Sequence, residues 1–486
     1  MALGGMSGER GYTAQAGSAA GGWESYLDAN LEDDAEAGAW IDTTAEAGRR
    51  AKVSYEREWF LQIARYAGYQ WLSYDRTSTL NLAEQPPWRV RITINRIVGY
   101  VRTLVAKMLK NRPIPACQPA TNDAEDVSVA RTAEKLVKFQ WDRQDMDSLL
   151  QEAMVWLFCC GNVAFKVGWD TETGDVLDIP EAAPPTPGAK PTNGRIYAGL
   201  DEAMASIGAE LADLMASQAP GQEMAMGDVG TWIRTPFDVV VPPDAIRFQD
   251  CAWMMEVVSM GTSEAEERYQ TKDLMSDADT RYGIGYFHDR IQRLVGPGAV
   301  GGDATYTQAN AVYVKELWVK PSRKHPRGRH IIRAGGKTIV NEEFPPGVKR
   351  IPIFWLEDIK IPGRVWAAST VENLWPVQAA YNRSRSQVIE SQNLMSHPKW
   401  LAPDEAEIGD DDITSEPGEV IRYRAGYKPE MVQPPEIPSY VGDHQNRLVG
   451  EMDDIAGVRD ISKAQAPTGL ESGIAHSLLQ AADDTR

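Results

Sequence analysis

The sequence predicts an α+β protein that is mainly helical and that works within an assembly. Residues 370–396 and 440–455 each form a long helical pattern, and residues 397–439 between them carry short strand patterns. The first pattern is polar on nearly every side. A helix without a wide apolar stripe must find partners in other subunits or line water. The pattern therefore indicates an assembly, with a solvated linker helix as the alternative.

The chain has 486 residues and a mass of 53.7 kDa, which is enough for several domains with a buried core. Its four cysteines include no CxxC pair, and its six histidines form no cluster with acidic residues, so we expect no metal and no cofactor. The sequence has no apolar run long enough to cross a membrane and no basic-then-apolar start typical of a secretory signal. We expect it to stay in the cytoplasm during assembly, without membrane contact.

The formal net charge is −19. This charge argues against a protein that holds nucleic acid tightly by neutralising phosphates. It is compatible with a protein that surrounds DNA and lets it slide, because an acidic wall repels the DNA backbone. The net charge therefore argues against tight DNA binding and is compatible with a channel through which DNA slides.

The N-terminal third of the chain is expected to be helical after a disordered start. Residues 1–45 are rich in glycine, alanine and acidic residues, and we expect a disordered acidic arm there. A helix with an aromatic face is predicted over 44–74. The next helix, over 95–110, has one apolar face and basic residues on the others. Those cations either contact DNA or form a solvated face, and the solvated face is the commoner case.

Two further helices are predicted at 123–143 and 146–160. The alternation after Gly161 predicts a strand pair that turns at Thr173-Gly174-Asp175. Residues 180–230 open with a run of proline and alanine, and we interpret them as a peripheral insertion.

Strands are predicted within 235–260 and 311–345, and the second region contains Gly335-Gly336-Lys337-Thr338. These four residues look like the end of a phosphate-binding loop. Such a loop needs another glycine five positions before Gly336, where this chain has Ile331. A turn between two strands also fits a hairpin better than a strand-to-helix loop. We find no catalytic motif elsewhere and predict that the protein is not an enzyme.

The segment 363–393 carries the most specific pattern. Ser369 or Thr370 can cap a helix there, with Glu372 or Asn373 reaching back to the first-turn amides. The run G-R-x-W-[AG]-x-S-x-V-x-x-L-x-P-x-Q-x-x-Y-N-x-x-x-S resembles the stem-entry segment of tailed-bacteriophage portal proteins, especially the head-to-tail connectors of podovirus-like phages. Ala367 stands where glycine is expected. The pattern N-R-I near residue 95 and the pattern G-N-x-A-x-K-V-x-W-D from Gly161 also resemble parts of the portal wing.

The resemblance implies the phage portal fold, which combines a wing, long stem helices and a small α/β clip in a ring. The implied regions are the wing at 46–369 with the insertion at 180–230, the first stem helix at 370–396, the clip at 397–439, the second stem helix at 440–455, the tunnel loop at 456–470, and the start of a channel or wing helix at 471–486. In the family a crown follows this helix, and we expect it to be missing here, either because the chain is truncated or because the crown is absent.

The resemblance also implies a function and its partners. Portals are twelve-subunit rings at one capsid vertex of the virion, and double-stranded DNA is packaged and ejected through their channel without sequence preference. Their partners are the terminase large subunit, the head-tail adaptor or neck proteins, and the major capsid and scaffolding proteins. The candidate residues are Arg459, Lys463 and Gln465 in the tunnel loop; Arg422, Arg424 and Lys428 in the clip; and Tyr381, Asn382, Arg383 and Arg385 in the stem.

Two other functions remain open from the sequence. Another phage neck or tail protein would also form a ring, but without the order stem, clip, stem. A carbohydrate-binding or carbohydrate-acting protein would use the fifteen tryptophans and seventeen tyrosines for sugar stacking. Several of these aromatic residues, such as Trp59, Trp141 and Trp156, lie at helix-periodic positions, which favours a place in the core.

Overall fold

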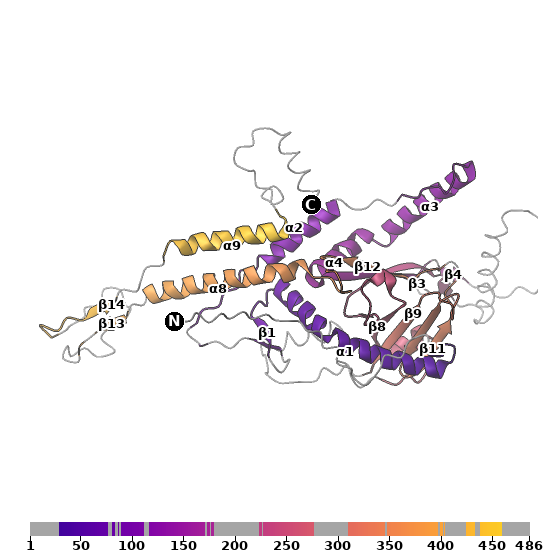
Figure 1. The fold of residues 1–486 in the computed structure, drawn as a ribbon, viewed down its shortest axis with the longest axis horizontal. Helices are drawn as coiled ribbons and strands as arrows, with labels where there is room; N and C mark the ends of the chain where they lie inside the picture. Colours follow the sequence, from indigo (N-terminus) through magenta and orange to yellow (C-terminus); the bar gives the residue numbers. More distant parts are fainter. Residues whose placement is uncertain are drawn as a thin grey trace, which may run out of the picture.

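The computed structural model shows a body of sheets and helices from which two helices project side by side (Figure 1). The structure describes residues 29–75, 80–82, 86, 89–110, 116–170, 173–174, 176–178, 223–225, 227–276, 310–345, 348–396, 399–401, 403, 424–432 and 438–458. The fold is mixed helix and sheet, which agrees with the predicted α+β class.

Helix α1 (Asp34–Tyr66) begins inside the segment predicted to be a disordered arm, so that prediction is wrong for residues 34–45. Asp33 caps the helix by accepting a hydrogen bond from the amide of Ala35 at 2.8 Å. Trp40 and Ile41 are buried against Trp253, Met255 and Ile331 of the large sheet. The apolar residues at 37, 40, 41 and 45 form a stripe along one side of the helix, and this stripe packs on the sheet. The glycine-rich, alanine-rich and acidic composition of the segment does not indicate it. The rest of the arm, residues 1–28, lies outside the described residues.

Helix α1 also ends earlier than predicted, at Tyr66 rather than at residue 74. Gly68 follows with a φ of +103°, a conformation that favours glycine and stops the helix. The residues beyond it form a short strand, β1 (Leu72–Tyr74), which pairs with β2 (Leu80–Leu82).

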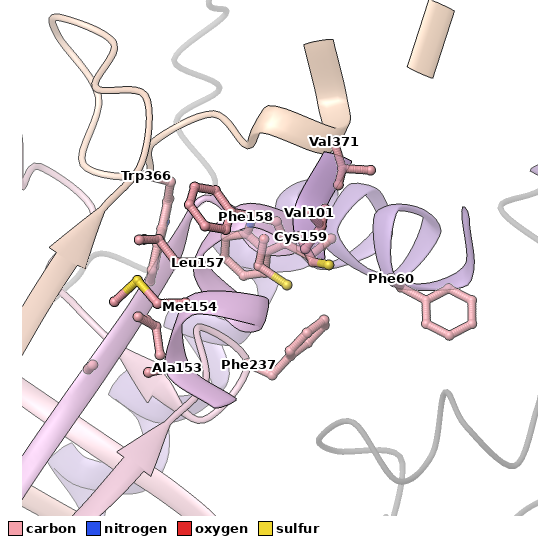
Figure 2. Packing of buried hydrophobic residues seen from close by; sticks show 14 of the residues in the cluster. Phe60, Val101, Ala153, Met154, Leu157, Phe158, Cys159, Phe237, Trp366 and Val371 are labelled. Atoms are coloured by element: carbon pink, nitrogen blue, oxygen red, sulfur yellow. The ribbon is translucent and has the colours of Figure 1, made fainter. Parts of the chain in front are cut away.

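The next three helices lie close to their predicted limits. They are α2 (Ile97–Lys110), α3 (Ala124–Arg143) and α4 (Met146–Cys160). Buried side chains of α1, α2 and α4 meet the residues just before α8 in the main hydrophobic core; Figure 2 shows Phe60, Val101, Phe158 and Trp366 among them.

A three-stranded antiparallel sheet has the order β12 (Ile353–Glu357), β3 (Asn162–Asp170), β6 (Asp228–Arg234). The predicted hairpin at 173–175 is wrong, because β4 (Val176–Asp178) pairs with β5 (Glu223–Ala225) and not with β3. Gly174 and Gly227 approach closely there: a Cβ on Gly174 would lie 2.6 Å from the carbonyl oxygen of Gly227. Strands β3 and β6 pair on one side of this close approach, and β4 and β5 pair on the other side.

A five-stranded antiparallel sheet has the order β11-β10-β9-β8-β7. Its strands are β7 (Val239–Val240), β8 (Trp253–Gly261), β9 (Ala311–Val319), β10 (Arg329–Ala334) and β11 (Lys337–Glu342). A 3-10 turn (η1, Phe248–Asp250) precedes β8, and α6 (Thr262–Arg268) follows it. Gly335 and Gly336 have φ values of +52° and +79° and form the β10–β11 turn. The prediction that this sequence is a hairpin and not a phosphate-binding loop is confirmed.

The C-terminal half holds the projecting pair of helices. Helix α8 (Thr370–Ser396) runs outward, β13 (Lys399–Leu401) and β14 (Glu430–Val432) pair at the far end, and α9 (Tyr440–Ala456) returns beside α8 (Figure 1). Both helices lie within about one residue of their predicted limits.

Three tryptophans of the main core, Trp59, Trp355 and Trp366, belong to one aromatic cluster. The rings of Trp59 and Trp366 are 5.0 Å apart and edge-on, and Trp355 stacks on Phe248 at 4.0 Å. Rings used in this way are not exposed on loops, where sugar stacking would need them. The described part of the chain therefore gives no support to the carbohydrate alternative.

Candidate functional site

The head of α8 is held by a capping box. The Ser369 hydroxyl accepts a hydrogen bond from the amide of Glu372 at 2.9 Å, and the Glu372 carboxylate accepts one from the amide of Ser369 at 3.5 Å. This reciprocal pair satisfies backbone donors that the first helical turn leaves unpaired. The predicted cap is confirmed, with Ser369 and Glu372 as its members.

Gly161 and Asn162 join the end of α4 to the entry of α8. The Asn162 side chain donates to the carbonyl of Ala367 at 3.2 Å and accepts from the Ala367 amide at 3.1 Å, as a neighbouring strand would. Gly161 has a φ of +77°, and a Cβ there would lie 2.7 Å from the Ala367 carbonyl oxygen. These two residues therefore set the distance and angle at which α8 leaves the body.

Asp358 holds the first residue of α8. One of its carboxylate oxygens accepts both the amide and the hydroxyl of Thr370, at 2.7 and 2.8 Å. Burial raises the pKa of Asp358 to about 6, although the two bonds from Thr370 act in the opposite direction. The carboxylate is thus a well-placed cap whose charge is poorly solvated.

We expect Asp358→Asn to become more stabilising, relative to the wild type, as the pH rises from 4 to 7. The folded pKa of about 6 exceeds the ordinary value of 3.8, so the stability this group contributes is complete below pH 3.8 and is lost as pH rises through 6. The amide oxygen keeps both bonds without the charge, and the gain at pH 7 is about 1–2 kcal/mol. Urea unfolding at each pH measures it; Asp443→Asn, on the exposed surface of α9, is the control. A difference independent of pH would contradict the assignment.

A row of polar side chains on α8 binds an extended segment of the same chain, residues 89–96, which we call the clasp. The backbone amides of Val90, Ile92, Ile94 and Arg96 donate to the side chains of Glu390, Ser386, Asn382 and Gln378, at 3.0, 3.1, 3.2 and 3.1 Å respectively. Gln378 also donates to the carbonyl of Ile94 at 2.9 Å. Every second amide of the clasp therefore bonds to every fourth residue of the helix.

The two repeats fit because their lengths nearly agree. Four helical residues rise about 6 Å, and two extended residues span about 6.6 Å, so three steps accumulate a mismatch of roughly 2 Å. The long side chains of Gln378 and Glu390 stand at the two ends of the row, and the short ones of Asn382 and Ser386 stand in the middle. Side-chain length therefore absorbs the mismatch.

Asn382 is the centre of this network. It is 1% exposed, donates to Gln70 at 2.5 Å, and accepts from Gln378 at 3.0 Å as well as from the clasp. Gln70 in turn donates to Asn95 at 2.9 Å. The prediction that the polar residues of this helix find partners in other subunits or water is wrong for this face, whose partners lie in the same chain.

Helices α8 and α9 are joined by both polar and apolar contacts. Arg385 donates to Gln445 at 3.1 Å, and Gln445 donates to Ser384 at 3.0 Å. Leu448 and Met452 of α9 are buried in the main core. Asp453, in the last turn of α9, accepts the hydroxyl of Tyr100 in α2 at 2.5 Å. The pair is therefore anchored to the body at its base.

The candidate residues fall into three groups. In the stem, Tyr381 and Asn382 are buried, Arg385 is half-buried and Arg383 is exposed. In the clip, Arg424 and Lys428 are exposed on the segment before β14. Arg422 of the clip, and Arg459, Lys463 and Gln465 of the tunnel loop, lie outside the described residues.

Sequence reasoning missed a buried ionic cluster that joins the two sheets. Lys166 of β3 lies 2.8 Å from Glu256 of β8 and also pairs with Glu316 of β9. Burial raises the pKa of Glu316, but the charge of Lys166 and a bond from His330 outweigh this and hold it well below its ordinary value. Lys166 belongs to the wing-like pattern after Gly161, but its partners are far away in the sequence.

A second buried lysine fixes α1 to the loop before β7. The Lys52 ammonium donates to the carbonyls of Pro236, Phe237 and Val239 at 3.0, 2.6 and 3.0 Å. Burial lowers its pKa, and the nearby carboxylate of Glu56 opposes that effect. Three carbonyls use all three ammonium donors, which makes Lys52 a structural residue.

Within the described ranges, no group of histidine, cysteine and acidic side chains could hold a metal ion. Among those same residues, no helix is both long and apolar enough to cross a membrane.

Comparison with protein families gives one result. Residues 230–486, more than half of the chain, match the model for the phage P22-like portal protein. The matched region runs from β6 through the large sheet and both projecting helices. Comparison with curated protein sequences finds no match.

Proposed function

The chain belongs to the phage P22-like portal protein family, and we propose that it forms a twelve-subunit ring at one vertex of the capsid. Portal proteins are structural proteins of the virion, so a capsid location follows from membership. The proposal adds the number of subunits and a central channel through which double-stranded DNA is packaged and ejected. Closed rings of this kind form when one surface of each copy binds a different surface of the next.

The projecting pair α8–α9 carries this proposal. It supports two antiparallel stem helices with the clip, residues 397–439, at their outer end (Figure 1). The body, from α1 to the head of α8, is then the wing. Another neck or tail ring protein would not need this order of helix, small strand unit and helix. The tunnel loop at 456–470 follows directly after α9 in this scheme.

Partners are assigned by region. We propose that the clip binds the terminase large subunit during packaging and the neck proteins afterwards, with the exposed cations Arg424 and Lys428 facing an acidic surface. The wing would contact the major capsid protein and the scaffolding protein. Arg459, Lys463 and Gln465 remain our proposed DNA-facing residues of the tunnel loop.

The net charge supports a channel that does not retain DNA. A chain with a charge of −19 repels the phosphate backbone along most of its surface. Contacts to phosphates carry no sequence information, so a few cations are sufficient to centre the duplex as it moves.

The mass and symmetry of the purified particle test the proposal. Twelve copies of a 53.7 kDa chain weigh about 640 kDa, which light scattering resolves from a monomer. We expect that mass together with a ring and a central hole in negative-stain images. A stable monomer that binds glycan would overturn the proposal, and a ring without a projecting stem would favour another neck or tail protein.

A further inference from the structure

One segment of this acidic chain carries positive charge and no negative charge. Residues 85–122 contain no aspartate or glutamate, although the whole chain has a net charge of −19. The segment includes the clasp and α2. Its seven cations are Arg89, Arg91, Arg96, Arg102, Lys107, Lys110 and Arg112.

Some of these cations have structural roles in the clasp. The guanidinium of Arg91 lies over the ring of Trp71 at 5.1 Å, and that of Arg96 lies over Tyr381 at 5.2 Å. Both contacts hold the clasp against the body and against α8.

Helix α2 has two chemically distinct faces. Ile97, Tyr100, Val101 and Val105 are buried in the main core. The opposite face follows the spacing i, i+3, i+4, i+7, i+8, i+11 of a single helical stripe. Its members are Gly99, Arg102, Thr103, Ala106, Lys107 and Lys110, which are exposed or half-exposed. Only small residues and cations occur on this face.

No acidic side chain of α2 itself lies beside the cations of this face. Arg102 is exposed, and no described carboxylate pairs with it. The cations of α3 provide the contrast: Lys138 pairs with Glu134 at 2.8 Å, and Arg143 pairs with Asp228 at 2.9 Å. A helix that contains no acidic residue has no such internal partner.

The position of α2 is also specific. The Tyr100–Asp453 hydrogen bond places the first turn of α2 beside the last turn of α9, and Figure 1 shows α2 near the base of the projecting pair. Helix α9 ends at Ala456, and the chain continues from there into residues 459–470. Helix α2 therefore lies where the stem joins the body, and its cationic face is opposite the side that packs into the core.

We propose that the exposed face of α2 binds backbone phosphates of double-stranded DNA, and this inference rests on the proposed channel function. Arg102 and Lys110 are separated by about 12 Å along the helix axis. A duplex presents one phosphate charge per roughly 1.7 Å of its axis, so suitable phosphates are always within reach and no register is required. Gly99, Thr103 and Ala106 let the duplex approach the helix closely. The acidic remainder of the chain disfavours binding elsewhere.

The test compares two pairs of substitutions that remove the same charge. Arg102→Gln/Lys110→Gln alters the α2 face, and Arg131→Gln/Lys135→Gln alters exposed positions on α3. Fluorescence anisotropy measures binding of the full chain to a labelled duplex of about 30 base pairs at several salt concentrations. We expect the α2 pair to weaken binding at low salt about tenfold and to reduce the slope of log K against log salt by roughly two. We expect the α3 pair to stay within about twofold of the wild type.

A second measurement depends on proximity rather than charge. A photo-crosslinker attached at Thr103→Cys is expected to label the duplex at least fivefold more than one attached at Ser128→Cys on the exposed surface of α3. Equal labelling, or equal weakening by both pairs of substitutions, overturns the inference.

Particle mass, measured on the same preparations, separates this inference from the proposed function. Rings that bind DNA equally well in both pairs would refute the α2 site and leave the portal function intact. An α2 pair that loses ring assembly but keeps the DNA affinity of each copy would make the face a contact between copies, which also refutes the site. Without rings, the portal proposal fails, and the comparison of α2 with α3 still decides whether the face binds phosphates.

Discussion

Replacing Asn382 with alanine is expected to lower the free energy of unfolding by about 3 kcal/mol. The substitution removes one buried side chain and leaves the backbone amide of Ile94 and the side-chain oxygen of Gln70 without the partner that Asn382 supplies. The side-chain amide of Gln378 loses one acceptor and keeps its bond to the carbonyl of Ile94. Each unsatisfied buried group costs roughly 1–3 kcal/mol, and relaxation of the clasp recovers part of that. Urea unfolding measures the total loss.

The local effect is equally specific. The amides of Ile92 and Ile94 bond to side chains of α8 rather than to a backbone ladder, so their protection from hydrogen exchange depends on α8. We expect Asn382→Ala to speed exchange of the clasp amides at least tenfold, and Gln387→Ala, at an exposed position on the same helix, to leave them unchanged. Unaltered exchange in the Asn382 variant would show that the clasp is held by other contacts.

The capping box at Ser369 and the limits of α8 could be predicted from the sequence because their causes are local. A serine three residues before a glutamate identifies the start of the helix, and the periodicity of Leu374 and its neighbours identifies the rest. The partners of the polar face could not be predicted in the same way. The clasp lies 282–300 residues away along the chain, and a polar residue at every fourth position looks the same on a solvated helix.

The predictions for the start of α1 and for the turn before β4 were wrong for related reasons. The stripe through Trp40 and Ile41 is present in the sequence, but alanine, glycine and acidic residues around it resemble a disordered arm. The turn residues around Gly174 favour a hairpin, and only the contact with Gly227 shows that the strands continue. In both cases the local structure depends on a contact with residues that are far away in the sequence.

The sequence predicted the family of the protein correctly, but it did not predict the role of each residue in the candidate site. The pattern over 363–393 identified the family, which the match over residues 230–486 confirms. Asn382, however, was interpreted as a residue facing other subunits and is an internal anchor. A sequence pattern shows which residue types occur at which positions. It does not show which of these residues bind partner proteins and which hold the helix within its own chain.

Lys166→Met is expected to have the largest effect, a loss of about 4 kcal/mol. The ammonium of Lys166 lies between the carboxylates of Glu256 and Glu316. The substitution removes this shared positive charge, so the two buried negative charges are no longer fully compensated. Arg234 still pairs with Glu256 and His330 still contacts Glu316, so the sheets remain in contact. The surface pair Lys360–Glu357 is the matched control, and Lys360→Met is expected to cost less than about 1 kcal/mol.

The pH dependence of the Lys166 variant distinguishes lost charge compensation from lost packing. In the wild type the low pKa of Glu316 contributes stability that is present above the unfolded value of 4.5 and is lost as pH falls. Without Lys166, burial dominates and raises the pKa of Glu316, so the variant regains stability as pH falls from 7 to 5. We therefore expect the two stability curves to converge at low pH, and Lys166→Met/Glu316→Gln to recover at least half of the loss at pH 7. A constant difference between the curves would mean that Lys166 acts through packing alone.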